Sequence, residues 1–367
     1  MIGRRCQAVV AALALMTAAV AVVGPLASSA GAATFNVTNN HDSGAGSLRQ
    51  ALLAAAAASG PDTVSVQAGV GTITLSSPID WTASGKGDQS VTINGNGVVV
   101  NANGQAGGLR DEGGTGVTVN AMTIEGVGSS DSSDTGAILS EGGAVSLSKC
   151  TLTNNHVDST ADDAGIVLSE GGALTINSCE ITNNTVDAED SNGATVHSEG
   201  GSVSITNSTI TGNTATAGDG DGAGGVLSEG GAVTVAISTI SGNTATASGD
   251  VGGGVLSEGG AVTFRTVTAN CNTGTAQNDG DAAGGVLSEG GDLTATGSSI
   301  VGNRATSNGG DVDNAVLVFG EKILNSTTVS DDQTVCAKQA TTTTTTAPAT
   351  TTTAAAQAVS TTPAFTG

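Results

Sequence analysis

The sequence predicts an all-β fold, a single-stranded parallel β-helix of about ten coils with a short capping helix at its N-terminal end. Three observations predict it. A repeat of about 30 residues runs along most of the chain. Short apolar-alternating segments inside each repeat have strand periodicity and no helical periodicity. The composition, finally, is poor in large side chains, which suits a thin, stacked core.

The repeat is marked by a glutamate in GAILSEGG, GIVLSEGG, ATVHSEGG and three copies of GGVLSEGG. An asparagine follows each of these glutamates at a constant distance, and only the distance to the next glutamate varies. We therefore expect all the length variation to lie in one loop per coil. The glutamates are Glu141, Glu170, Glu199, Glu229, Glu258 and Glu289; the asparagines are Asn155, Asn184, Asn213, Asn243, Asn272 and Asn303.

The composition supports stacking. The 367 residues include 56 Gly, four Phe, one Trp and no Tyr. A core of Val, Ile, Leu and Ala is thin, and one all-β repeat cannot bury its own apolar face unless neighbours stack on it. A propeller blade needs roughly 40 residues or more, which is longer than this repeat.

The N-terminal residues 1–33 read as a signal peptide, with Arg4 and Arg5, an apolar run, and a small-residue cleavage pattern at 30–32. This predicts export to the cell surface or medium. No second apolar run is long enough for a membrane span. The net charge of −23 excludes nucleic acid as a partner, because binding it requires an excess of Lys and Arg.

Residues 34–61 are expected to form a strand and the capping helix, in which Ser47 and Gln50 make a capping box. Residues 62–111 then form the first irregular coils, and 112–338 form the regular repeats. Residues 339–367 are a Thr/Ala/Pro-rich tail of low complexity that cannot bury a core and is expected to be disordered.

The repeat sequence contains a glycine pair, a short apolar segment and, at 207–215, NSTITGNTA. It resembles the repeats of secreted right-handed parallel β-helix proteins with polymorphic-outer-membrane-protein-like repeats. NVTNNHDSGAGSLRQAL at 36–52 resembles the N-terminal segment of the same proteins, and the final PAFTG is similar to actinobacterial sortase signals. The resemblance implies a right-handed coil of the pectin-lyase-like class. That class includes lyases, hydrolases and adhesins, so it implies no single function.

Strand alternation predicts which way each repeat residue points. A column of buried carboxylates would be costly, so the glutamates should point outward and the valine before each leucine should point inward. The leucines should then form an outward apolar column beside the glutamates. Either this face is merely solvated, or it is a contact stripe for a partner. The leucines are Leu139, Leu168, Leu227, Leu256 and Leu287.

Two further sets of polar residues are candidates for a role. The loop pairs Asp219-x-Asp221 and Asp279-x-Asp281 have the oxygen ligands of a weak calcium site, or are simply solvated acidic loops. The asparagines should form a structural ladder along the stack. Cys150 and Cys179 should be stacked neighbours, whereas the pairing of Cys271 and Cys336 is not readable from spacing.

No motif marks a catalytic residue, and no cofactor other than calcium is suggested. The sequence therefore favours a non-catalytic structural or adhesive protein whose partner is an unidentified surface protein or glycan. One alternative is a polysaccharide lyase or glycoside hydrolase of the pectin-lyase-like class. A minor alternative is ice binding, through Thr-x-Thr at 214–216, 244–246 and 273–275.

Overall fold

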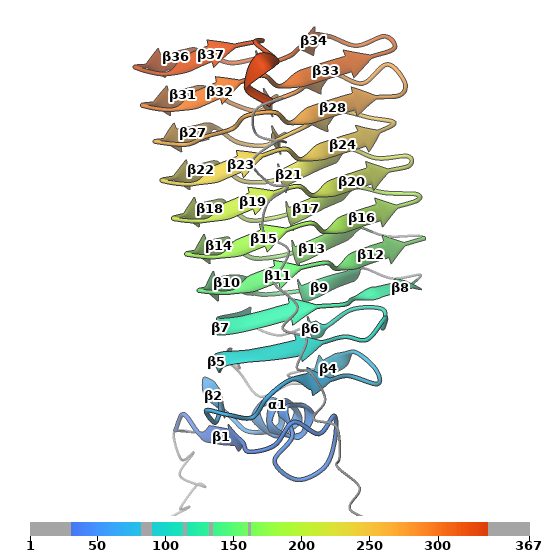
Figure 1. Cartoon of the computed structure of the whole chain (residues 1–367), viewed down its shortest axis with the longest axis vertical. Coiled ribbons are helices and arrows are strands. Elements are labelled where there is room, and N and C mark those ends of the chain that lie inside the picture. Colours follow the sequence, from blue (N-terminus) through green and yellow to red (C-terminus); the bar gives the residue numbers. More distant parts are fainter. Residues whose placement is uncertain (1–30, 82–89, 113–115, 132–134, 161–162, 337–367) are drawn as a thin grey trace, which may run out of the picture.

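The computed structural model describes residues 31–81, 90–112, 116–131, 135–160 and 163–336. These residues form one rod of stacked coils, in which every strand pair is parallel (Figure 1). The predicted all-β parallel β-helix is therefore confirmed. Most of the predicted signal peptide and the Thr-rich tail lie outside the described residues.

Sheet A contains the most strands, and several coils in the middle of the rod contribute two strands to it. Its strands are β1 (Thr34–Val37), β2 (Asp62–Val66), β3 (Ile73–Thr74), β5 (Val91–Asn101), β7 (Gly116–Glu125), β10 (Ala144–Ser148), β11 (Thr151–Thr153), β14 (Leu174–Asn177), β15 (Glu180–Thr182), β18 (Val203–Thr206), β19 (Thr209–Thr211), β22 (Val233–Ala236), β23 (Thr239–Ser241), β27 (Val262–Arg265), β31 (Leu293–Thr296) and β36 (Lys322–Asn325). A separate pair, β32 (Ser299–Val301) and β37 (Thr328–Ser330), lies in the last two coils.

Sheets B and C complete the coil. Sheet B contains β4 (Ile79–Trp81), β6 (Leu109–Asp111), β9 (Thr135–Ser140), β13 (Ala164–Ser169), β17 (Gly193–Ser198), β21 (Gly222–Ser228), β25 (Val251–Gly252), β26 (Val255–Ser257), β29 (Ala282–Ala283), β30 (Val286–Ser288), β34 (Val312–Asp313) and β35 (Val316–Val318). Sheet C contains β8 (Gly128–Asp131), β12 (His156–Ser159), β16 (Thr185–Ala188), β20 (Thr214–Ala217), β24 (Thr244–Ala247), β28 (Thr273–Ala276) and β33 (Arg304–Ser307).

The register follows the sequence repeat, with one difference in where the extra residues lie. Ala194 pairs with Ala223, but Val196 pairs with Val226, so the second strand gains one residue between these pairs. The extra residue of that coil is therefore a bulge inside β21, not part of the loop as predicted. The extra length of a later coil does lie in the loop, between the sheet C pair Ala247–Ala276 and the sheet B pair Val251–Ala282. Glycines at 224 and 225 allow the bulge, because a Cβ at either would meet the backbone of the next coil.

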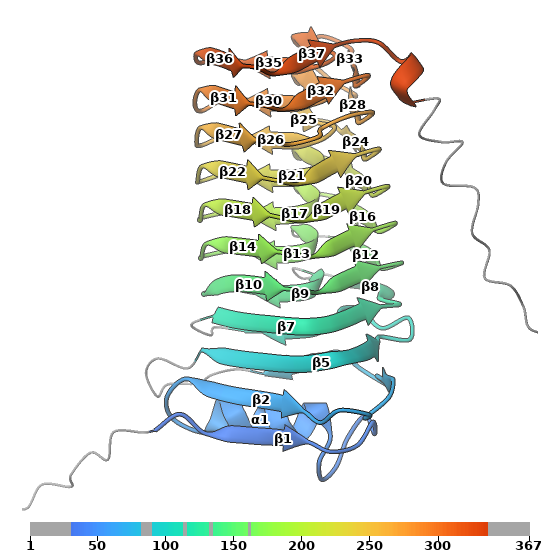
Figure 2. The same cartoon turned by 60° about the vertical axis from the view of Figure 1, so that its left-hand side comes forward.

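The helix α1 (Leu48–Ala57) lies at the N-terminal end of the rod against β1 and β2 (Figure 2). Its Leu48 and Leu52 are fully buried, so the helix covers the core at that end. The Ser47 hydroxyl accepts the Gln50 backbone N–H as predicted. The Gln50 side chain accepts the N–H of Gly46, one residue before the position that a capping box predicts. No helix in the described residues is long and apolar enough to cross a membrane.

One continuous hydrophobic cluster runs from Val37 in the first strand to Val316 in the last coil. It contains the residue before each repeat leucine, as alternation predicts: Ile138, Val167, Val196, Val226, Val255 and Val286. The valines therefore fill the space between sheets A and B.

The predicted asparagine ladder is present at the corner between sheets A and C. Each Asn Nδ2 donates to the Oδ1 of the asparagine one coil on, at 3.0–3.1 Å, from Asn155 through Asn303. The same Nδ2 also donates to a backbone carbonyl of the preceding coil, such as Ile181 O for Asn213. All six asparagines are at most 2 % exposed. The ladder satisfies buried amides without any charge.

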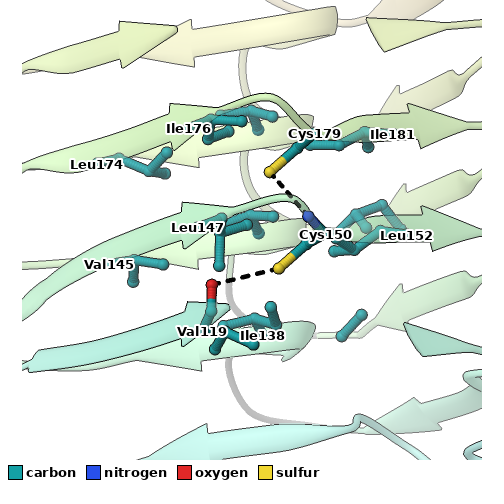
Figure 3. Packing of buried hydrophobic residues seen from close by; sticks show 14 of the residues in the cluster. Val119, Ile138, Val145, Leu147, Cys150, Leu152, Leu174, Ile176, Cys179 and Ile181 are labelled. Carbon is teal, nitrogen blue, oxygen red and sulfur yellow. Dashed lines mark hydrogen bonds between the residues drawn. The ribbon is translucent and has the colours of Figure 1, made fainter. Parts of the chain in front are cut away.

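The four described cysteines form two pairs of different kinds. Cys150 and Cys179 are free, buried thiols in successive coils, where the Cys179 Sγ accepts the Cys150 N–H at 3.3 Å (Figure 3). Cys271 and Cys336 form a disulfide. This bond ties the chain after the last strand to a coil below it.

Candidate functional site

The recurring sequence Ser-Glu-Gly-Gly forms a turn after the sheet B strand in each repeat. The serine hydroxyl donates to the carbonyl of the second glycine, as in Ser228 to Gly231 at 2.8 Å. A Cβ at that glycine would collide with the backbone of the glycine one coil earlier. Tight stacking of these turns therefore requires glycine, and it places one glutamate per coil in a column beside the strand ends.

The predicted exposed leucine column is wrong in one respect. The leucines lie on the opposite face of sheet B from the valines of the main core, as alternation requires, but every one of them is 0 % exposed. Leu227, Leu256 and Leu287 form a second small cluster with Ala194, Ala223 and Ala283. The outer face of sheet B thus carries its own apolar strip, and no leucine stripe is available to a partner.

A row of five aspartates and one asparagine, called the acidic row below, precedes the same strands. Each member accepts, through its side-chain oxygen, the backbone N–H of the member one coil on. The row is Asp163, Asn192, Asp221, Asp250, Asp281 and Asp311. Because these residues stand at the start of the strands and the glutamates at their ends, the apolar strip lies between two polar columns.

The two columns meet across neighbouring coils. The Asn192 Nδ2 donates to Glu229 Oε1 at 2.9 Å. In the next coils the corresponding neighbours are both carboxyl groups, because Glu258 lies beside Asp221 and Glu289 lies beside Asp250. We infer that these side chains, which bridge from one coil to the next, form the polar layer over the buried leucines.

A hydrogen bond between two carboxyl groups requires a proton on one of them. Burial, followed by the charges of Asp221 and Glu229, raises the pKa of Glu258 to about 8. Burial and the contact with Asp250 raise the pKa of Glu289 to about 8 as well. The pKa of Asp221 is also raised, again mainly by burial. With pKa values of about 8, Glu258 and Glu289 each hold a proton at neutral pH, which can be donated to the neighbouring aspartate.

His197 replaces leucine in one coil and changes the local chemistry. It pairs in register with Leu168 and Leu227 and is fully buried. Its Nε2 lies 2.7 Å from Glu229 Oε1. Burial alone would lower the pKa of His197, but the bond to Glu229 and the charge of Asp163 outweigh it, and the pKa is raised. Burial would likewise raise the pKa of Glu229, but His197 lowers it. The two form an ion pair in which His197 is fully buried and Glu229 is partly exposed.

Asp163, His197 and Glu229 each offer one atom within 4.8 Å of the others, and this is the one such group of three metal-ligating side chains in the described part of the chain. Two carboxylates and an imidazole are a ligand set suited to zinc or a similar cation. The hydrogen bonds already present account for the same arrangement, since Asp163 accepts the Asn192 N–H and Glu229 accepts from Asn192 and His197.

The four aspartates predicted as calcium ligands do not gather at one place. Asp221 and Asp281 belong to the acidic row, where their Oδ1 atoms accept backbone N–H groups. Asp219 and Asp279 are exposed in the loops before it. Sequence reasoning missed the acidic row itself, although its members recur once per repeat; the loop position of these aspartates hid their regularity.

The family described as right handed beta helix region matches residues 82–268 and 135–333. The chain belongs to this family. The match confirms the right-handed β-helix that the repeat resemblance implied. No curated protein and no solved structure matches the chain.

Proposed function

We propose that this β-helix protein is an exported, non-catalytic rod that acts at the cell surface or outside the cell as a structural or adhesive element. The observation that carries the proposal is repetition. The asparagines and the acidic row recur in register and bond from coil to coil, and the turn serines close the same turn in each coil. Groups committed to neighbouring coils stabilise a rod and extend its surface uniformly.

Export is supported by the disulfide between Cys271 and Cys336, because such bonds persist in oxidising compartments. It also agrees with the signal peptide predicted from residues 1–33. The polymorphic-outer-membrane-protein-like character of the repeats, and an actinobacterial source, belong to the same proposal.

The adhesive surface would be the acidic face of sheet B, which carries the half-buried glutamates along one side and the acidic row along the other. Its partner is expected to be a surface protein or glycan that presents cationic groups or bridging cations. Weak calcium binding is part of this proposal, with the acidic row as its site in place of the loop aspartates.

The proposal is tested by incubating the purified chain with acidic and neutral polysaccharides and measuring new reducing ends and new double bonds. We expect neither above the buffer control. Cleavage by the wild type would contradict the proposal, and its loss in Glu229→Gln would favour the alternative.

That alternative is a polysaccharide lyase or hydrolase centred on Asp163, His197 and Glu229. The observation that favours it is that His197 breaks the leucine column at the one described place where two carboxylates and an imidazole meet. Retained cleavage in Glu170→Gln, a glutamate of the same column two coils away, would localise the activity.

Two columns of threonines on sheet C favour a second candidate function, ice binding. Thr214, Thr244 and Thr273 pair in register on sheet C, as do Thr216, Thr246 and Thr275. These threonines are at least partly exposed. Thermal hysteresis that disappears in Thr246→Val would support this function, whereas no hysteresis at millimolar protein would exclude it.

A further inference from the structure

The two ends of the rod differ in how the hydrophobic core is closed. At the N-terminal end, α1 buries Leu48 and Leu52 over the first strands. At the C-terminal end, the residues that continue the core columns are open: Leu324 pairs with the buried Ala295, and Val329 pairs with the buried Ile300, yet they are 38 % and 36 % exposed.

Other apolar residues extend this open end. Phe319 stands where the glutamate of the SEGG turn stands in the six preceding coils, and it is 55 % exposed. Ile323 pairs with Thr294, which pairs with Thr263, so an apolar residue replaces a threonine column. Val312 is also exposed. The last coil is therefore more apolar on its outer positions than the coils below it.

The backbone of the last coil is unpaired on the same side. β36 pairs with β31, β35 with β30, β34 with β29 and β37 with β32, and none of the four has a second strand neighbour among the described residues. Open edges with exposed apolar side chains are templates for further strand pairing.

The chain that follows is directed away from this end. Gln333 donates to Asn303 O at 2.9 Å, and Cys336 is bonded to Cys271, two coils below the last. Figure 2 shows the short helical turn at 334–336 beside the rod, clear of the end face. The route therefore carries the chain down the side of the stack after β37.

We propose that the open end docks on the same end of a second copy of this chain, joining two rods tail to tail. The helix covers the core at the other end, which disfavours a head-to-tail filament. A two-fold axis perpendicular to the rod brings the two β36 strands together antiparallel and covers Phe319, Leu324 and Val329 of both copies. This self-association goes beyond the proposed function and does not depend on whether the rod adheres or cleaves.

Charge sets the conditions for docking. Asp311, Asp313 and Glu321 surround the open end, and Lys322 is the one basic residue between 311 and 336. Two copies therefore repel each other at low salt. Because these groups are near the surface, salt screens the repulsion, and the dimer should tighten as ionic strength rises.

The test uses sedimentation of the full exported chain over a range of concentrations at about 20 and about 300 mM salt. We expect a monomer–dimer equilibrium with tighter association at the higher salt. The variants Phe319→Glu and Ile323→Thr restore the residues of the lower coils, so they should fold normally and weaken dimerisation at least tenfold. Ile237→Ser, at an exposed isoleucine in the middle of the rod, is the matched control and should leave it unchanged.

Amine cross-linking of mixed light and heavy protein identifies the occupant. A link from Lys322 of one copy to Lys322 of the other supports the proposal. A monomer at every concentration and salt, or a link from Lys322 to Lys338 within one chain, overturns it. So does a dimer that survives both end variants.

Discussion

The asparagine ladder and the acidic row run along the same rod, one coil apart at every step, but they are satisfied in different ways. Each asparagine side chain is both donor and acceptor, so Asn213 donates to Asn243 and accepts from Asn184 without help. Each carboxylate is an acceptor only. The acidic row therefore needs a donor from elsewhere in every coil.

The glutamates beside the acidic row find such a donor in two ways. In one coil, Asn192 and His197 both bond Glu229 Oε1. In the next two coils, Glu258 lies beside Asp221 and Glu289 lies beside Asp250. There the proton that each glutamate retains can serve as the donor. A repeated column can thus be uniform when its side chain is self-complementary, but it must vary, or take up protons, when its side chain is not.

The largest loss of stability is expected when an asparagine of the ladder is replaced by an aspartate. Asn213→Asp removes two buried donors and places a carboxylate at a position that is 1 % exposed. We expect a loss of about 4 kcal/mol in the free energy of unfolding at pH 7. Urea unfolding followed by circular dichroism measures it. Asn278→Asp, an exposed loop position, should cost less than about 0.5 kcal/mol; equal losses would contradict the comparison.

The next effect is expected at His197. His197→Ala leaves a cavity and removes the partner of Glu229, so the unfolding free energy should fall by about 2 to 3 kcal/mol at pH 6. The raised pKa of His197 means that this contribution is present below pH 6.5 and lost as pH rises through the folded-state pKa. His197→Leu restores the residue of the neighbouring coils and should recover the packing part of the loss. If the leucine variant is as unstable as the alanine variant, the apolar strip does not extend through this coil.

Replacing the shared protons with amide donors should give a smaller, stabilising effect. In Asp221→Asn/Asp250→Asn, each amide can donate to Glu258 or Glu289, as Asn192 does to Glu229, and still accept the backbone N–H of the next coil. We expect a gain of about 1 to 2 kcal/mol at pH 8 and little change at pH 5.

The raised pKa values of two glutamates also predict how the stability of the wild type depends on pH. The pKa values of Glu258 and Glu289 are about 8 in the folded chain, well above 4.5. The folded state therefore holds protons that the unfolded chain releases, and their contribution, complete below pH 4.5, is lost as pH rises through about 8. Melting temperatures from pH 5 to 9 should fall in the wild type and stay flatter in the double variant. Parallel profiles would show that these pairs share no proton.

The smallest effect is expected at Asp281, one coil further on. The position that would supply its glutamate is Phe319, so no carboxyl pair forms there. Asp281→Asn should change the unfolding free energy by less than about 0.5 kcal/mol at pH 8. A gain as large as that of Asp221→Asn would mean that the stabilisation comes from lowering net charge alone.

The fold and the ladder were predictable because both depend on which residues recur at the repeat distance. The constant step from glutamate to asparagine placed Asn213 above Asn184. Coils that stack about 4.8 Å apart bring such side chains within hydrogen-bonding distance. The candidate site was only half predictable. Alternation placed Leu227 on the outer face but could not show that it is covered, and His197 looked like an interruption of a column.

By itself, then, the sequence determined the stack, its register and its inward residues, because periodicity states which side chains lie above one another. The tertiary structure alone decided the contacts that run diagonally between coils. Asn192 and Glu229 are separated by more than one repeat, so no periodic count pairs them. Those contacts cover the leucines and hold the shared protons. The open C-terminal end was likewise decided in three dimensions, because exposure there reflects the missing next coil and the sideways tether at Cys336.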